Sequence, residues 1–276
     1  MYYLKEVRYC VAGSNADMFK SVGDGNCDDY RDKDCTGEGI LYITDSSVIA
    51  RRLIDMDCAV LVRLHEGNRE EDFSFCQYAY EVEEGSDAEP EEEYLERIYR
   101  RCKGMPWDIL ETERCLIRET TVEDVEDFYR IYNDSSITEY METLYDNVED
   151  ERAYARDYIR QVYAFYEFGI WTVVEKASGE VIGRAGICYR EGCELPELGF
   201  VIAADRQGQG LATEVCTAIL QYGYEELGFD KILAFVQPDN AASHRVCEKL
   251  RMERVENVVL QGQEYVVYAW LSERYS

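Results

Sequence analysis

The segment Glu197-Leu-Gly-Phe-Val-Ile-Ala-Ala-Asp-Arg-Gln-Gly-Gln-Gly-Leu-Ala-Thr-Glu214 predicts a strand, a glycine turn and a helix in direct succession. Residues 197–202 form an apolar run typical of a strand, and apolar residues recur at helical spacing from Leu211 onward. At the start of such a helix the backbone N–H groups are unpaired, the helix dipole favours an anion, and glycine lets the backbone approach it closely. The segment therefore predicts a site suited to a pyrophosphate.

Two later segments extend this pattern. Lys231-Ile-Leu-Ala-Phe-Val-Gln237 predicts another strand, and Pro238-Asp-Asn-Ala-Ala-Ser243 the start of another helix. In this order the motifs resemble the GNAT superfamily of N-acetyltransferases over residues 113–272, closest to the branch with the ribosomal-protein alanine acetyltransferases. The resemblance implies an α/β fold with a mixed, splayed central sheet and flanking helices, and acetyl-CoA as cosubstrate.

The resemblance also implies which residues hold the cofactor. The family signature Q/R-x-x-G-x-G/A is met by Gln207, Gly210 and Ala212. The phosphates would lie against the turn and the start of the helix, at Gln207, Gly208, Gln209, Gly210, Leu211, Ala212 and Thr213. The pantetheine arm would pair like an additional strand with the backbone of Phe200, Val201 and Ile202, and Asn240 matches the asparagine that contacts this arm. Three cations would add local positive charge: Arg206, Arg245 and Lys249.

Acetyl transfer to an amine needs a base for the amine, a polarised carbonyl, and a proton for the departing thiolate. Glu197, on the strand beside the expected thioester, is the preferred base. Its alternative role is to pair with a neighbouring basic group or remain solvated. Glu194, Glu256 and Glu264 are further candidates for the base.

The proton donor departs from one pattern of the family. Related enzymes carry a tyrosine seven residues after the asparagine or a serine three residues after it, and here these positions hold Cys247 and Ser243. Ser243 is therefore the preferred donor, while Cys247 is chemically able to donate because its ordinary pKa is about 8.5. The alternatives are a helix-capping hydroxyl for Ser243 and a buried small hydrophobe for Cys247. Arg251 replaces the glycine that usually ends this helix, which predicts modest strain there.

The acceptor is expected to be a primary amine, on a protein N-terminus or on a small molecule. Tyr154, Tyr158, Phe165 and Tyr166, on a helix predicted over residues 150–168 and closed by Gly169, line an acceptor groove or belong to the core. A second hypothesis is an acetyl-CoA-binding sensor without turnover. The sequence leaves the oligomeric state open, a dimer included.

Residues 1–110 are expected to form a separate small α/β domain ahead of a GNAT domain at 113–276. A strand over 39–45, a helix over 46–57 and a strand over 58–64 predict a parallel βαβ unit. Its loop 65–69 follows the carboxyl end of a strand, where such sheets often hold ligands. The unit faintly resembles a haloacid-dehalogenase-type Rossmann fragment, but without an Asp-x-Asp motif no phosphatase activity is carried over.

Composition narrows the remaining classes. Acidic residues outnumber basic ones 57 to 29, giving a net charge of -28, which argues against nucleic-acid binding and permits a cationic acceptor. Eleven scattered cysteines without a C-x-x-C pair fit a reducing compartment, and two histidines make the usual zinc sets hard to assemble, so we expect no metal. No apolar run is long enough to span a bilayer, so we expect a cytoplasmic protein without membrane association.

Overall fold

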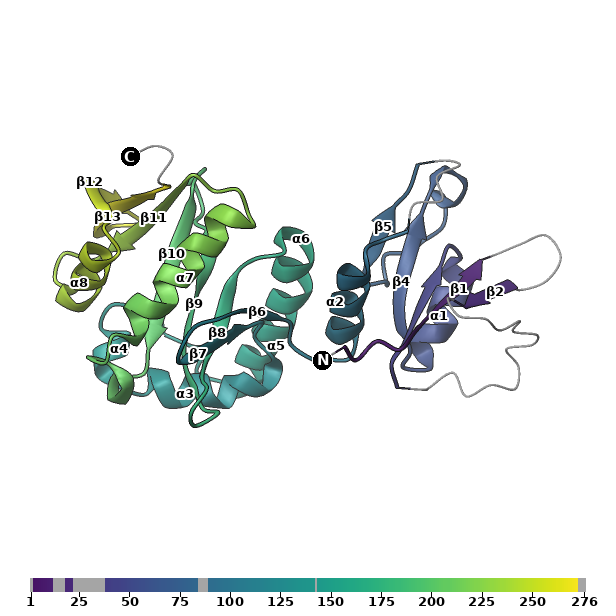
Figure 1. The fold of residues 1–276 in the computed structure, drawn as a ribbon, viewed down its shortest axis with the longest axis horizontal. Coiled ribbons are helices and arrows are strands. Elements are labelled where there is room, and N and C mark those ends of the chain that lie inside the picture. Colours follow the sequence, from purple (N-terminus) through teal and green to yellow (C-terminus); the bar gives the residue numbers. More distant parts are fainter. Residues whose placement is uncertain (1, 12–17, 22–37, 84–88, 142, 273–276) are drawn as a thin grey trace. The chain divides into compact units, whose positions relative to one another are not determined.

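The computed structural model describes residues 2–11, 18–21, 38–83, 89–141 and 143–272. The chain divides into two compact units, Met1–Trp107 and Asp108–Ser276, and each has its own sheet (Figure 1). Both units combine helices with a sheet, so the predicted α/β class is confirmed.

The first unit contains a five-stranded sheet in the order β2-β1-β3-β4-β5, parallel except for β2. Its elements are β1 (Glu6–Val11), β2 (Met18–Ser21), β3 (Ile40–Thr44), α1 (Ser47–Asp55), β4 (Ala59–Leu64), the 3-10 turn Glu66–Asn68, β5 (Ala79–Glu81) and α2 (Glu92–Cys102). β3 is buried along its whole length because both of its faces pack against other elements. The predicted parallel βαβ unit is β3-α1-β4.

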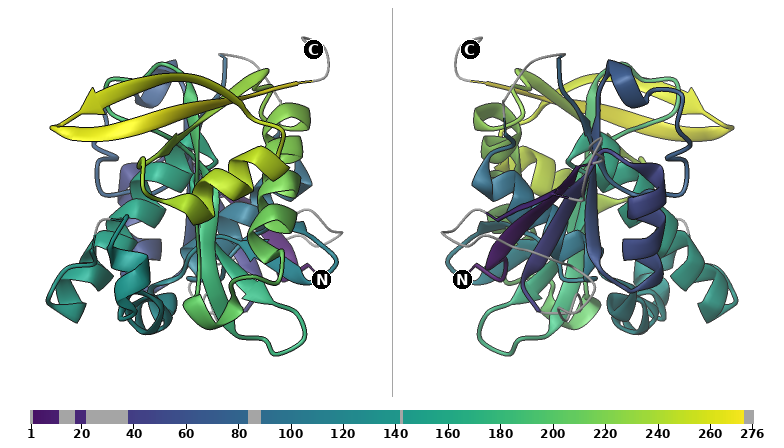
Figure 2. Two further views of the ribbon diagram at one scale, coloured as in Figure 1. Left: turned by 90° about the vertical axis from the view of Figure 1, so that its left-hand side faces the viewer. Right: turned by 90° about the vertical axis from the view of Figure 1, so that its right-hand side faces the viewer.

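The second unit contains an eight-stranded sheet in the order β12-β13-β11-β10-β9-β8-β7-β6. Its strands are β6 (Asp108–Glu111), β7 (Cys115–Arg118), β8 (Ile170–Glu175), β9 (Val181–Tyr189), β10 (Pro196–Ile202), β11 (Lys231–Val236), β12 (Glu253–Leu260) and β13 (Gln263–Leu271). Neighbouring strands are antiparallel except β10 and β11, which are parallel. Figure 2 shows β12 and β13 as a long hairpin at one end of this sheet.

Helices cover both faces of the second sheet. They are α3 (Val125–Tyr132), α4 (Ser135–Thr138), α5 (Val148–Tyr158), the π-helical segment Ile159–Tyr163, α6 (Ala164–Tyr166), α7 (Leu211–Glu225) and α8 (Ala241–Lys249). Residues of α7 and α8 share one hydrophobic core with Leu198 and Ile202 of β10. Val201 of the same strand packs into a second core with Phe128 and Ile131 of α3. Alternate residues of β10 therefore face opposite helix layers, as strand geometry requires.

The predicted long helix over 150–168 is interrupted. It consists of α5, the π-helical segment and α6, and Glu167 takes the left-handed conformation that ends it, with φ of 61°. Gly169 is small for a packing reason, because a Cβ there would lie 2.7 Å from the Tyr158 hydroxyl. After α8, Arg251 adopts a φ of 57°, the strained helix end expected from its replacement of glycine.

Candidate active site

β10 and β11 diverge along their length. Between these two strands the register pairs one set of residues, Glu197 with Leu233. β10 nevertheless stays paired with β9 over residues 196–202, and β11 with β13 over 231–236. The edge of β10 that faces β11 is therefore open over residues 198–202, and an extended ligand can pair with its backbone.

The glycine turn follows this open edge directly. Gly208 and Gly210 have φ angles of 74° and 83°, which other residues adopt only at a cost of about 1–2 kcal/mol. Gly210 is the N-cap of α7, and the backbone N–H of Glu214 donates to its carbonyl at 3.0 Å. The N–H groups of residues 211–213 precede that bond and belong to the unsatisfied first turn of the helix. The turn thus presents backbone donors and the positive end of a helix dipole, a suitable site for an anion.

Arg114 holds this turn in place. Its backbone N–H and Nε donate to the Glu214 carboxylate at 2.9 and 2.7 Å, and Nη1 donates to the Gln209 carbonyl at 3.0 Å. Burial acts to raise the pKa of Glu214, but hydrogen bonds from Thr112 and Arg114 outweigh it and lower that pKa. Sequence reasoning missed Arg114, because its partner lies 100 residues further along the chain.

The cations expected near the turn differ in their surroundings. Arg206 binds Glu180 at 2.8 Å and Asp205 at 3.0 Å, and its Nε lies 3.6 Å from Glu175. Its charge is therefore largely neutralised by the protein itself. Arg245 and Lys249, by contrast, are exposed to solvent on α8.

Glu197 is almost fully buried at the point where β10 and β11 diverge. Its two carboxylate oxygens accept hydrogen bonds from Nε and Nη2 of Arg190 at 2.7 and 2.8 Å. Arg190 in turn lies over the rings of Phe235 and Tyr265, 4.9 and 5.4 Å from their centroids. The hydrogen bond to Glu197 is the largest cause of a raised pKa at Arg190. Glu197 thus pairs with a neighbouring basic group, as expected for the alternative to a catalytic base. Each of its carboxylate oxygens nevertheless keeps a further lone pair that can accept a proton.

The other candidate bases have less shelter than Glu197. Glu194, Glu256 and Glu264 are all exposed to solvent.

Asn240 and Ser243 meet at the start of α8. Asn240 is the N-cap, and its Oδ1 accepts from the backbone N–H of Ser243 at 3.0 Å. His244 fixes the same turn, with Nδ1 2.9 Å from the Tyr268 hydroxyl and Nε2 3.1 Å from the Pro238 carbonyl. The Asn240 amide nitrogen remains a donor that a ligand can use.

Cys247 lies in the core beneath α8. Its side chain is completely buried, and burial raises the pKa of its thiol to about 12. A fully buried thiol that keeps its proton fits the alternative role of Cys247, that of a small hydrophobic core residue.

A protein-family model described as an acetyltransferase (GNAT) domain matches residues 114–253, half of the chain. The chain belongs to the GNAT acetyltransferase family. The uncharacterized N-acetyltransferase YoaA of Bacillus subtilis (strain 168) is 30% identical over 158 residues, which cover 55% of this chain and 86% of YoaA. The predicted family and enzyme class are therefore confirmed.

Solved structures of acetyltransferases share the fold of the GNAT unit. A GNAT-family acetyltransferase from Bacillus anthracis is 26% identical, with a TM-score of 0.51 over 59% of this chain and 98% of that one. The aminoglycoside acetyltransferase AAC(6')-Ib, solved in complex with coenzyme A, is 21% identical, with a TM-score of 0.50 over 58% of this chain and 96% of that one.

The aromatic residues predicted near a GNAT acceptor groove divide into two groups. The hydroxyl of Tyr158 is enclosed and accepts a hydrogen bond from the backbone N–H of Ile170 at 2.8 Å. Tyr154 and Tyr166 are each 44% exposed and Phe165 is 79% exposed. Tyr158 is therefore partly buried and fixed by its hydroxyl, whereas the other three present exposed aromatic surface.

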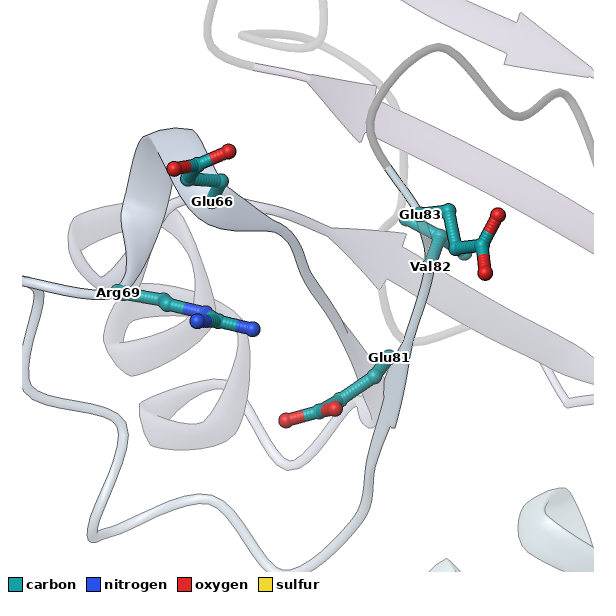
Figure 3. A pocket seen from close by; sticks show the side chains of 5 residues that line it. All are labelled: Glu66, Arg69, Glu81, Val82 and Glu83. Carbon is teal, nitrogen blue, oxygen red and sulfur yellow. The ribbon is translucent and has the colours of Figure 1, made fainter.

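The unit preceding the GNAT domain contains a cavity of about 370 Å³ at the carboxyl ends of β4 and β5. Figure 3 shows its lining side chains: Glu66, Arg69, Glu81, Val82 and Glu83. The loop expected at this edge borders the cavity. In the part of the chain that the structure describes, no group of three His, Cys, Asp or Glu residues is placed to hold a metal ion, and no helix is long and apolar enough to cross a membrane.

Proposed function

We propose that this GNAT enzyme moves the acetyl group of acetyl-CoA to a primary amine by direct attack within a ternary complex. The observation that supports this most is the open edge of β10, which leads into the unsatisfied N-terminus of α7. A thioester on a long pantetheine arm with a diphosphate has the matching shape and charge. The arm would lie along residues 200–202, and the diphosphate against the backbone of residues 208–213. The structure with coenzyme A bound to a protein of the same fold supports this choice of ligand.

In the proposed reaction the amine nitrogen attacks the thioester carbonyl. A C–N bond forms, the C–S bond breaks, and the electron pair of the latter leaves on the coenzyme A sulfur. Glu197 takes the amine proton, directly or through a water, with a lone pair that Arg190 leaves free. The Ser243 hydroxyl donates its proton to the departing thiolate, which leaves as the thiol, and solvent carries the proton taken by Glu197 back to Ser243. Arg190 holds the Glu197 carboxylate in one orientation.

The acceptor is proposed to be a primary amine of a small molecule or a protein N-terminus. Tyr154, Phe165 and Tyr166 offer exposed aromatic surface on the α5 to α6 segment. The excess of acidic residues favours an acceptor that carries positive charge.

Thiol release from acetyl-CoA in the presence of an amine library tests this proposal. We expect turnover with at least one amine, and a kcat about 10²–10⁴-fold lower in Glu197→Gln. The acidic limb of the pH profile, where protonation of the base lowers kcat, should also disappear in this variant. Glu194→Gln is the matched control, because this exposed carboxylate lies three residues away and should leave kcat unchanged.

Two outcomes contradict the proposal. Binding of acetyl-CoA without turnover on any amine would favour the sensor. Unchanged turnover and an unchanged pH profile in Glu197→Gln would remove Glu197 from the base role.

A further inference from the structure

Arg184 is a half-buried cation to which the described residues offer no anionic partner. It lies on β9, its Nε is buried without a hydrogen-bond partner, and its guanidinium carbon is 4.5 Å from the centroid of the Phe128 ring. Across the described parts of the chain, the structure shows no hydrogen bond or ion pair from this guanidinium. Other arginines of the same unit are held by carboxylates: Arg114, Arg118, Arg130, Arg152, Arg190 and Arg206.

Apart from burial, tyrosines that are uncharged at neutral pH have the largest effects on the pKa of Arg184. Burial acts to lower its pKa, and the hydroxyls of four tyrosines act to raise it, with a raised pKa as the result: Tyr132, Tyr163, Tyr158 and Tyr154. Burial also raises the pKa values of Tyr158 and Tyr163, so neither becomes an anion. These tyrosines therefore leave the positive charge uncompensated.

The nearby carboxylate of Asp124 is already occupied. It accepts from Thr172, the residue opposite Arg184 on β8, at 2.9 Å. Its two oxygens also accept from Nη1 and Nη2 of Arg118 at 2.7 and 2.6 Å. Burying a cation without an anionic partner destabilises a fold. In a chain with 57 acidic residues, one of them could have paired with this cation.

The strand register places Arg184 on the same face of the sheet as Glu197. It is opposite Val201, which lies four residues beyond Glu197 on β10 and points to the same face. Four strand residues span about 13 Å, a distance that the side chains of Arg184 and Glu197 shorten from both ends. Gly186 and Gly199 lie between them on this face, and Cδ1 of Ile170 lies 3.1 Å from the position that a Cβ of Gly199 would take. An acceptor whose amine is at Glu197 would cross this side chain to reach the guanidinium.

We propose that Arg184 binds a carboxylate of the acceptor, so that the preferred substrate is an amine with an anionic group several bonds away. This inference rests on the proposed function, because it assumes that the amine reacts beside Glu197. A guanidinium binds a carboxylate through two parallel hydrogen bonds, which gives orientation as well as attraction. The exposed ring of Tyr154 adjoins this route through its contact with Tyr158, 6.1 Å between centroids.

The test uses aliphatic ω-amino acids of increasing chain length, each compared with its ω-amino amide. Both members carry the same kind of amine, so the ratio of their kcat/KM values isolates the carboxylate. We expect the wild type to prefer the acid by about tenfold or more at one chain length, and Arg184→Met to bring this ratio close to one. Arg184→Lys should recover part of the preference. Arg160→Met, at an exposed arginine beyond α5, is the matched control and should keep the full ratio.

Thermal unfolding separates this role from a structural one. Because Arg184→Met removes a half-buried charge that no described carboxylate compensates, we expect it to raise Tm by about 2–4 °C. A lower Tm together with an unchanged acid-to-amide ratio would make Arg184 a structural residue and overturn the proposal. A wild type without preference for the acid would overturn it as well.

A binding titration keeps this test independent of the proposed reaction. Hexanoate and hexanamide are titrated into the wild type and into Arg184→Met without acetyl-CoA. If no amine is acetylated, the proposed function fails, but the titration still tests the carboxylate site. Hexanoate binding that is about tenfold weaker in the variant than in the wild type supports this site. Equal binding of hexanoate by both proteins contradicts it.

Discussion

Ser243 and Cys247 are one helical turn apart on α8, and burial gives their side chains different chemistry. Ser243 is half-buried beside the helix start, where the N-cap Asn240 already fixes its backbone. Cys247 is fully enclosed in the core and keeps its proton, because water cannot stabilise the thiolate there. Burial therefore favours a packing role for Cys247, and Ser243 stays the proposed donor to the leaving thiolate.

This difference predicts an alkaline loss of stability that depends on Cys247. Its thiol pKa is about 12 in the folded chain and about 8.5 in the unfolded one, so the folded state holds the proton between these values. The free energy of unfolding should consequently fall as pH rises above about 8.5, by up to about 1.4 kcal/mol per pH unit from this group. Denaturant unfolding of wild type and Cys247→Ala under reducing conditions measures this slope.

We expect a shallower alkaline slope in Cys247→Ala, and a kcat at neutral pH within about twofold of the wild type. Cys193→Ala, which removes a partly exposed thiol, is the control and should retain the wild-type slope. Equal slopes in wild type and Cys247→Ala, or a large loss of kcat in the latter, would speak against the packing role.

At the scale of elements, the protein's own contacts shape the turn between β10 and α7. Two left-handed glycines set its path, Arg114 ties it to Glu214, and the Gln207 side-chain amide donates to the carbonyl of Ile202 at 3.0 Å. Little reorganisation is then needed when a diphosphate arrives, which favours tight binding.

Gly210→Ala tests the role of this turn. The added Cβ makes only an ordinary contact, 3.7 Å from Arg114, but an alanine is strained at a φ of 83°, so the N-terminus of α7 should shift. We expect the KM for acetyl-CoA to rise about tenfold while the KM for the amine stays unchanged. Gly228→Ala is a matched control at the other end of α7, with a φ of 73° and open space around the new Cβ. A comparable rise of the acetyl-CoA KM in both variants would show a general loss of stability instead.

Local signals predicted most elements of the GNAT unit, and long-range packing accounts for those that were missed. β10 and β11 lie within one residue of their predicted bounds, because strand periodicity is encoded within a few residues. β6 and the π-helical segment Ile159–Tyr163 carry no such signal. The hydroxyl of Tyr163 in that segment contacts the distant Thr120 backbone, at 3.2 Å.

The candidate site follows the same division. The motif from Glu197 to Glu214 predicted the backbone part of the site, from the strand to the glycine turn. The assignment of this part to coenzyme A stays a prediction. The hydrogen-bond partners of its side chains could not be predicted. Arg190 reaches Glu197 across a turn, and Arg114 reaches Glu214 from 100 residues away, so the local sequence indicates neither pair.

At the scale of the whole molecule, an anionic cofactor has to bind a chain with a net charge of -28. A general positive field is therefore unavailable, and Arg206 is already paired with acidic residues. Backbone N–H groups at a helix start can still attract the diphosphate, because they act at short range and are not paired with carboxylates.

We further propose that the two compact units are separate domains, with the cofactor site entirely in the second. The second unit includes β6, which the expected domain start at residue 113 would remove from the edge of the sheet. Residues 1–107 contribute a parallel sheet with a cavity of its own.

A crystal structure of the full chain with coenzyme A tests the central claim most directly. The account predicts diphosphate oxygens about 2.7–3.2 Å from backbone nitrogens of residues 208–213. It also predicts the pantetheine arm alongside residues 200–202, in the opening between β10 and β11. A diphosphate bound elsewhere, for example in the cavity beside Arg69, with this opening empty, would contradict it.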